Sequence, residues 1–265
     1  MKITWLGHSS VLLDTDGVRL LADPLLRDRV GLLRRTVPVP ESAAVGSVGV
    51  AAVLLSHLHD DHCDLRSLRR LDAPVVVVPP GAGRWLTARG VRGVRELRPG
   101  RSMAIGPVLV YAVPAEHDGS RRPWGPRASA VGHLVIGGAS AYLAGDTALH
   151  EGMATVPEIA GLPGPDLAVL PVWGWGPRLG PGHLSPGQAA EAALLVRARY
   201  AVPVHWATLY PLGMRRVMRR RLVEPGPEFA AAVAALGARR HADPETLPRV
   251  SVLPVGGSLE VVGRR

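Results

Sequence analysis

The hydrophobic pattern of the first eighty residues predicts strands. Apolar and polar residues alternate through residues 3–22, with Asp16 and Gly17 between two β-rich runs, so we expect a hairpin closed by a tight turn. The runs 48–56 and 74–79 are continuously apolar, which is typical of buried strands. This region therefore predicts both half-exposed and fully buried strands.

Helical spacing alternates with further strands along the rest of the chain. Leucines three residues apart predict a helix over 64–73, and Ser185 is suited to cap a later helix. Strands are expected at 108–113, 130–136, 140–145, 166–172 and 200–206, helices at 187–198 and 227–240, and two short strands around Gly256 and Gly257. This order predicts an α/β fold, and without repeats or low-complexity linkers we expect one domain over residues 1–265.

Composition narrows the class of protein. The chain has 265 residues with 31 basic and 22 acidic side chains, a net charge of +9, and a single cysteine, Cys63. A core of this size needs no disulfides, and one cysteine excludes a disulfide framework. No charge-free apolar run approaches the ~18 residues of a membrane span, and the N-terminal segment does not resemble a signal peptide. We therefore expect a soluble, cytoplasmic protein.

A cluster of metal-ligand residues directly follows the apolar run 48–56. Its members, in the spacing HxHxDH, are His57, His59, Asp61 and His62. Further residues of this kind, His117, Asp146 and His205, each follow a predicted strand. Four such side chains within six residues can hold two divalent cations close together, whereas a polar loop of exposed histidines would not explain the later three. The sequence therefore predicts a dinuclear metal site.

The seven ligands divide between two ions. We expect His57, His59 and His117 on one ion, Asp61, His62 and His205 on the other, and Asp146 as a bridge. Zinc is the expected metal, with manganese and iron as alternatives, because histidine and carboxylate sets accept all three. The cations outweigh the two carboxylates and a bridging hydroxide, so the site favours a small anionic substrate.

The motifs together resemble a known superfamily. The order of these motifs resembles the pattern of the metallo-β-lactamase superfamily: HxHxDH, then a lone histidine, then GD, then a second lone histidine. Within it, residues 3–235 resemble bacterial relatives of N-acyl-phosphatidylethanolamine phospholipase D and, more distantly, the ascorbate-6-phosphate lactonase group. The segments that carry this are TWLGHSSVLL, LLADPLL, WLTARGV, AEHDGSR, LAGDT, DLAVLPVWGWGPR, GHLSPGQAAEA and VPVHWATLY. The resemblance implies an αββα sandwich with the metal site at one edge of its two sheets.

The resemblance also implies a hydrolase that uses a hydroxide held by both metals. Asp61 would orient the hydroxide and shuttle its proton. His183 matches an active-site histidine of the phospholipase-like branch, as a donor to the substrate or an acid for the leaving group, and the alternative is an exposed loop histidine. We expect a phosphodiester or phospholipid-like substrate; the alternatives are a lactonase or carboxyl-ester hydrolase, a nuclease, or a non-catalytic metal-binding module.

Two segments are candidates for contact with partners. Trp173, Trp175 and Arg178 precede His183 and are candidates for the wall of a substrate pocket, or the two rings simply pack. Residues 210–223 place apolar side chains at helical spacing with arginines mostly opposite. This predicts a basic amphipathic helix that contacts an anionic membrane through 214–222, or a solvated surface helix. Nucleic acid is not an expected partner, because no aromatic and basic interleaving marks a strand-binding groove.

The remaining histidines and the cysteine have less defined roles. His8 follows a predicted strand and either supports the ligands or packs in the core. His150 either reaches the rim of the site or lies in a solvated loop. His133 and His241 are expected to be structural, and Cys63 is expected to be a buried thiol.

Overall fold

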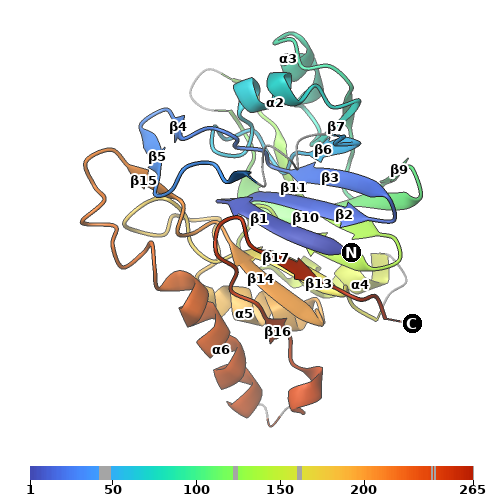
Figure 1. Ribbon diagram of the computed structural model, residues 1–265. Coiled ribbons are helices and arrows are strands. Elements are labelled where there is room, and N and C mark those ends of the chain that lie inside the picture. The colour runs from blue at the N-terminus through green and yellow to red at the C-terminus, as the bar shows by residue number, and fades with distance from the viewer. Residues whose placement is uncertain (42–48, 122–124, 160–162, 240, 242, 265) are drawn as a thin grey trace.

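The computed structural model describes residues 1–41, 49–121, 125–159, 163–239, 241 and 243–264 (Figure 1). Two seven-stranded sheets lie face to face with helices outside them. In spatial order the first sheet contains β17 (Ser258–Glu260), β1 (Lys2–Gly7), β2 (Ser10–Thr15), β3 (Val18–Ala22), β6 (Ala52–Leu54), β7 (Val75–Val78) and β8 (Val94–Glu96). The second contains β16 (Arg249–Val250), β14 (Tyr200–Val204), β13 (Leu167–Pro171), β12 (Ser140–Leu143), β11 (Ser129–Ile136), β10 (Val108–Asp118) and β9 (Ser102–Ile105).

Side chains along the strands point alternately to the two faces of a sheet, and both faces of the first sheet are packed. In β2, Val11 and Leu13 face the core between the sheets, whereas Leu12 faces outward with Leu21 of β3. Successive strand side chains point to opposite faces, so the first sheet buries both of its faces. The predicted αββα sandwich is confirmed.

Helices cover the two outer faces. The outer core of the first sheet includes side chains of α2 (Leu65–Leu71) and α3 (Gly83–Thr87). The second sheet is covered by α5 (Pro186–Leu195) and α6 (Pro225–Arg239), while α4 (Val156–Ile159) and two short 3₁₀ helices, η1 (Glu151–Thr155) and η2 (Pro244–Thr246), lie in connections. Ser185 caps α5 in a reciprocal capping box with Gln188, as the sequence predicts.

Most predicted elements are present with shifted ends. Asp16 and Gly17 form the β2–β3 turn with φ of 50° and 75°, which confirms the predicted hairpin. The strand expected over 48–56 is only β6, and residues 48 and 240 lie outside the described residues. β10 continues past its predicted end to Asp118, and the two last strands join different sheets.

The helix predicted over 210–223 is wrong. β15 (Leu209–Pro211) occupies its start and pairs with β5 (Leu33–Arg35), which also pairs with β4 (Arg29–Val30) in a small third sheet. Residues 212–223 form turns with isolated helical hydrogen bonds, such as Met218 N to Met214 O at 2.9 Å. Arginines at i and i+4 repel along a helix, which disfavours its propagation.

Among the described residues, no helix has both the length and the hydropathy needed to cross a lipid bilayer.

Candidate metal centre

Four strands deliver the predicted ligands to one place. The loop after β6 carries HxHxDH, β10 carries His117 near its end, Asp146 follows β12, and His205 follows β14. Gly145 permits the close approach of Asp146, because its φ is +62° and an added Cβ would lie 2.5 Å from Ser56 Cβ. The structure therefore brings together all seven predicted ligands from both sheets.

The first ligand group consists of His57, His59 and His117. His59 Nδ1 lies 2.9 Å from His57 Nε2 and 3.2 Å from His117 Nε2. Three ring nitrogens at such distances from one another fit a shared cation better than they fit mutual hydrogen bonds.

The second group contains Asp61, His62 and His205, as predicted, and it also contains His8. Nε2 of His62 and Nε2 of His205 are 3.2 Å apart, and each lies 3.8 Å from Asp61 Oδ2. His8 Nε2 is closer to that oxygen, at 2.8 Å. His8 thus holds the carboxylate of Asp61, which favours the supporting role over simple packing.

Asp146 stands between the two groups. Its Oδ2 lies 3.2 Å from Nε2 of both His62 and His205, and 3.3 Å from His183 Nε2. Asp146 is also grouped with His57 and with His117. Asp146 therefore lies near residues of both ligand groups.

Backbone and side-chain acceptors orient the rings. Nδ1 of His62, His117 and His205 lies 2.8, 2.8 and 2.9 Å from Asp23 Oδ2, Gly182 O and Trp173 O, respectively. Each ring therefore donates from Nδ1 and directs Nε2 toward the centre, where Nε2 would bind a metal ion. Such outer partners fix the tautomer of metal-binding histidines.

The carboxyls and imidazoles at the centre shift one another's pKa. Burial opposes ionisation of Asp61 and Asp146, but neighbouring histidines outweigh burial and hold the pKa of both carboxyls well below the usual range. Burial also opposes protonation of His62, yet Asp146, Asp61 and Asp23 hold its pKa well above the ordinary value. Burial lowers the pKa of His117 to about 4. The ionised carboxyls of Asp61 and Asp146 thus place negative charge among the buried rings of the centre.

The residues fit divalent cations. Asp146 Oδ1 is buried and makes no hydrogen bond within the described part of the chain, and it would gain a partner from a metal ion. The donor set of imidazole nitrogens and carboxylate oxygens suits zinc, manganese or iron. A cation would also balance the negative charge of the Asp61 and Asp146 carboxylates.

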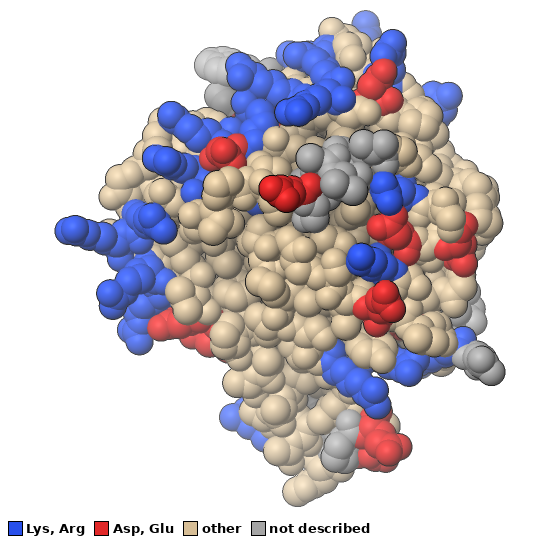
Figure 2. Space-filling view, in the orientation of Figure 1, with Lys and Arg blue, Asp and Glu red and all other residues tan. Residues whose placement is uncertain are grey.

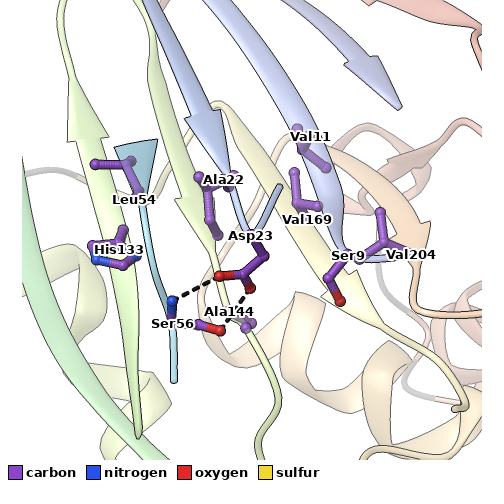
Figure 3. Close-up of a pocket in the computed structure, with 12 residues that line it drawn as sticks. Ser9, Val11, Ala22, Asp23, Leu54, Ser56, His133, Ala144, Val169 and Val204 are labelled. Carbon is purple, nitrogen blue, oxygen red and sulfur yellow. Dashed lines mark hydrogen bonds between the residues drawn. The ribbon is translucent and has the colours of Figure 1, made fainter. Parts of the chain in front are cut away.

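Asp23 supports the centre and was not anticipated as a site residue. Its Oδ2 accepts from Ser56 Oγ at 2.6 Å and its Oδ1 accepts from Ser56 N (Figure 3). The same Oδ2 accepts from His62 Nδ1 at 2.8 Å. Beside it is a small space of about 20 Å³, lined also by Ser9 and His133, which has room for one water molecule. In the sequence, Asp23 lies within LLADPLL at the end of a predicted strand. That position is the one feature of the sequence that points to a role for Asp23 at the site.

Arg121 fastens the loop that carries HxHxDH. Its Nη1 donates to Leu58 O at 3.1 Å and Cys63 O at 2.8 Å, and its Nη2 pairs with Asp60. Asp64 caps α2 at the end of this loop, accepting from Ser67 N at 2.9 Å. Both ends of the ligand loop are therefore fixed by charged side chains.

A cavity of about 530 Å³ opens beside the metal centre. His59, Asp61, Asp146 and His183 face it, together with residues 174–180. Trp175, which is 42% exposed, and Arg178 belong to this wall, as expected. Most of the remaining wall is glycine, proline and leucine, so the cavity combines one guanidinium with apolar surface.

Trp173 is not part of the wall, contrary to the expectation. It is buried in the main core, and its Nε1 donates to Gly176 O at 3.0 Å. Trp173 follows β13 by two residues and is still buried, whereas Gly174 is half-buried and Trp175 is exposed. Its carbonyl group nevertheless serves the site by orienting His205.

The remaining candidates lie outside the two ligand groups. His150 is partly buried beside Glu116, and burial lowers its pKa. His133 lies buried within β11, which confirms a structural place, and His241 is exposed. Cys63 is buried, and burial raises the pKa of its thiol to about 12, in agreement with an inert thiol.

Comparisons with known proteins agree with this geometry. A family model described as the Beta-lactamase superfamily domain matches residues 18–206. The N-acyl-phosphatidylethanolamine-hydrolyzing phospholipase D 1 of Caenorhabditis elegans is 32% identical over 79% of this chain, but the match spans 64% of that protein, less than two thirds. A UPF0173 metal-dependent hydrolase of Methanopyrus kandleri is 31% identical over 80% of this chain and 86% of its own.

Solved structures show the same fold. Igni18, a metallo hydrolase from Ignicoccus hospitalis, superposes with a TM-score of 0.71 and 22% identity over 97% of both chains. The isothiocyanate hydrolase from Delia radicum gut bacteria superposes with a TM-score of 0.67 and 16% identity over 99% of this chain and 100% of its own. At these identities the likeness concerns the fold alone.

Proposed function

Because the chain belongs to the beta-lactamase superfamily and is a metal-dependent hydrolase of that family's fold, we propose that it hydrolyses a small anionic phosphodiester or phospholipid-like substrate at a pair of metal ions. The observation that carries this is the juxtaposition of two ligand groups that share Asp146 and face one cavity. The C. elegans relative is named for hydrolysis of such a lipid, which supports the choice of substrate class.

Two zinc ions held by His57, His59, His117, Asp61, His62, His205 and Asp146 would supply a nucleophilic hydroxide near neutral pH and stabilise negative charge that develops on the substrate. Asp61 accepts a hydrogen bond from His8 on Oδ2, so its carboxylate has a fixed orientation. Its low pKa keeps it ionised, which suits it to accept a hydrogen bond from a water molecule and so to orient that molecule.

His183 is placed to donate a proton. Burial opposes its protonation, but a hydrogen bond to Asp146 outweighs burial and raises its pKa. Its side chain is 23% exposed and faces the cavity, where a leaving-group oxygen would lie. We assign it as the general acid for the leaving group, while Arg178 binds the anionic group of the substrate.

A lactone or other carboxyl ester is the second candidate substrate. The cavity wall carries only one guanidinium among the residues that the structure describes there, and the rest is largely apolar. An uncharged acyl substrate would fit such a wall as well. Rates on bis-p-nitrophenyl phosphate and on a panel of lactones, measured with zinc-loaded protein, separate the two. Turnover of lactones without any phosphodiester turnover would contradict the first choice.

Asp61→Asn tests the role of the orienting carboxylate. We expect a soluble, folded protein whose turnover falls by ~100-fold or more, because the water molecule loses the carboxylate that orients it. Asp14→Asn is the matched control, since Asp14 pairs with Arg19 far from the cavity and is only partly buried. Near-normal turnover of Asp61→Asn would refute the assigned role.

His183→Ala tests the proposed general acid. We expect turnover to fall by ~10²-fold or more while the metal content stays at that of the unchanged protein. The loss should be smaller for substrates with a good leaving group, because these need no proton. If the variant instead loses metal, His183 is a ligand and the acid lies elsewhere.

A further inference from the structure

One side of the molecule gathers exposed arginines on two segments that lie together in space. We call it the arginine surface, and it comprises Arg29, Arg34, Arg215, Arg216, Arg219 and Arg220. Figure 2 shows basic side chains along the side where Figure 1 places β4, β5, β15 and the segment after β15. The two segments, 28–37 and 210–224, contain Asp28 and Glu224 as their only acidic residues.

Strand pairing places several of these charges in one row. Arg29 of β4 lies opposite Arg34 of β5, and Arg34 lies opposite Tyr210 of β15. The guanidinium of Arg215 lies 6.0 Å from the centre of the Tyr210 ring. Like charges directly opposite one another destabilise a sheet, and an external anion would relieve this repulsion.

The two acidic residues do not neutralise the row. Glu224 Oε1 accepts from Arg220 Nε at 2.9 Å in an exposed i, i+4 pair. Asp28 Oδ1 accepts from the backbone N of Val39 at 2.9 Å. The arginine surface therefore keeps a large positive charge.

Exposed aliphatic side chains lie among the arginines. Leu32 occupies the two-residue turn between β4 and β5 and is 75% exposed, and its carbonyl accepts from the backbone N of Leu212 at 2.9 Å. Leu212 and Val217 are exposed as well, at 40% and 65%. Exposed apolar side chains beside exposed cations are typical of a surface that enters a lipid interface.

We propose that the arginine surface docks this protein on an anionic lipid bilayer, with the arginines on the headgroups and Leu32, Leu212 and Val217 in the interface. Charge complementarity favours an anionic partner, and the exposed aliphatic tip favours a bilayer over a nucleic acid, which offers no apolar interior. The chain connects this surface to the neighbourhood of the cavity, because Arg221, next to Arg220, lies 4.2 Å from the ring centre of Trp173, which precedes wall residues 174–180 in the sequence. Docking is independent of the substrate proposed above.

Cosedimentation of the full chain with vesicles tests the proposal. We expect binding to mixed phosphatidylcholine–phosphatidylglycerol vesicles, weak binding to phosphatidylcholine alone, and loss of binding as salt rises. Replacing Arg215, Arg216, Arg219 and Arg220 with glutamine should weaken binding more than ~10-fold. Leu32→Ser should weaken it by about 5-fold or more through lost apolar burial. Turnover of a soluble substrate should be unchanged in both variants.

The matched control removes the same charge from other exposed arginines, by Arg66→Gln, Arg70→Gln, Arg98→Gln and Arg101→Gln. We expect this control to retain binding. Equal loss in the control set would mean that net charge alone attracts the vesicles, and it would overturn the proposal. Absence of binding to anionic vesicles, with or without binding to RNA homopolymer, would overturn it as well.

Discussion

At the scale of single residues, the hydrogen bonds of Nδ1 on three histidine rings orient these rings at the centre. His62, His117 and His205 each direct Nδ1 to an acceptor outside the ligand groups, so their Nε2 atoms converge. His8 and His205 follow strands of different sheets, and His205 N donates to His8 O at 2.9 Å. Both residues adopt a left-handed backbone conformation, with φ of 52° and 64°. Such conformations are costly, and they persist where surrounding contacts hold them.

Asp23→Asn tests this view of the outer acceptors. The amide can still contact His62, but it removes the negative charge that fixes the donating Nδ1 of that ring. We predict a loss of about 10- to 100-fold in metal affinity, measured by competition with a chelator, and a similar loss in turnover. Asp14→Asn serves again as the control. Unchanged metal affinity would show that Asp23 only packs beside Ser56.

The sequence predicts the metal-ligand residues better than it predicts the residues that orient them through hydrogen bonds. HxHxDH, His117, Asp146 and His205 were recognisable because ligand-type residues followed strands. Asp23 was missed because its partner His62 is distant in the sequence, and only the pairing of β3 with β6 brings them together. Trp173 was misplaced because the sequence does not show where β13 stops and the chain turns outward.

At the scale of elements, the ligand loop depends on Arg121. This guanidinium contacts Leu58, Asp60 and Cys63, which span the loop. It also lies 5.3 Å from the ring centre of Trp85, over which Arg89 stacks at 4.1 Å. A side chain from the strand-to-strand connection after β10 therefore sets the shape of the loop after β6.

Arg121→Lys is predicted to loosen the loop, because a single ammonium cannot span three acceptors. We expect about 10-fold weaker metal binding, and a lower midpoint of thermal unfolding without metal, with the overall fold retained. Arg89→Lys is the matched control, since it alters stacking on Trp85 without touching the loop. Equal effects of the two changes would assign the role to Trp85 packing.

Short strands that form only through tertiary pairing could not be predicted from the sequence. The start of α5 is predictable because Ser185 is suited to cap a helix, and in the structure it does so. The segment after β15 showed helical spacing as well, yet pairing of β15 with β5 and repulsion among its arginines leave only turns. Periodicity cannot anticipate a tertiary strand pairing of three residues.

At the scale of the whole molecule, one core joins the two sheets and buries several neutral histidines. Burial lowers the pKa of His133 to about 4 from its usual 6.5. The unfolded chain therefore takes up a proton near pH 6.5, whereas the folded chain does so only near pH 4. Stability is consequently lost as pH falls between these values.

His133→Gln tests this dependence. The variant cannot bind that proton in either state, so its stability should fall less between pH 6.5 and 4 than that of the unchanged protein. The expected difference over this range is about 3 kcal/mol, measured by urea unfolding in the presence of a chelator. Identical pH slopes would show that His133 is protonated inside the folded core.

The central claim is that side chains from both sheets hold a pair of metal ions through a shared Asp146. Elemental analysis of zinc-loaded, exhaustively dialysed protein tests it most directly. We predict two zinc ions per chain, with a clear deficit after Asp146→Ala in a protein that remains folded. A centre that retains no zinc, or that retains two ions after Asp146→Ala, would contradict the account.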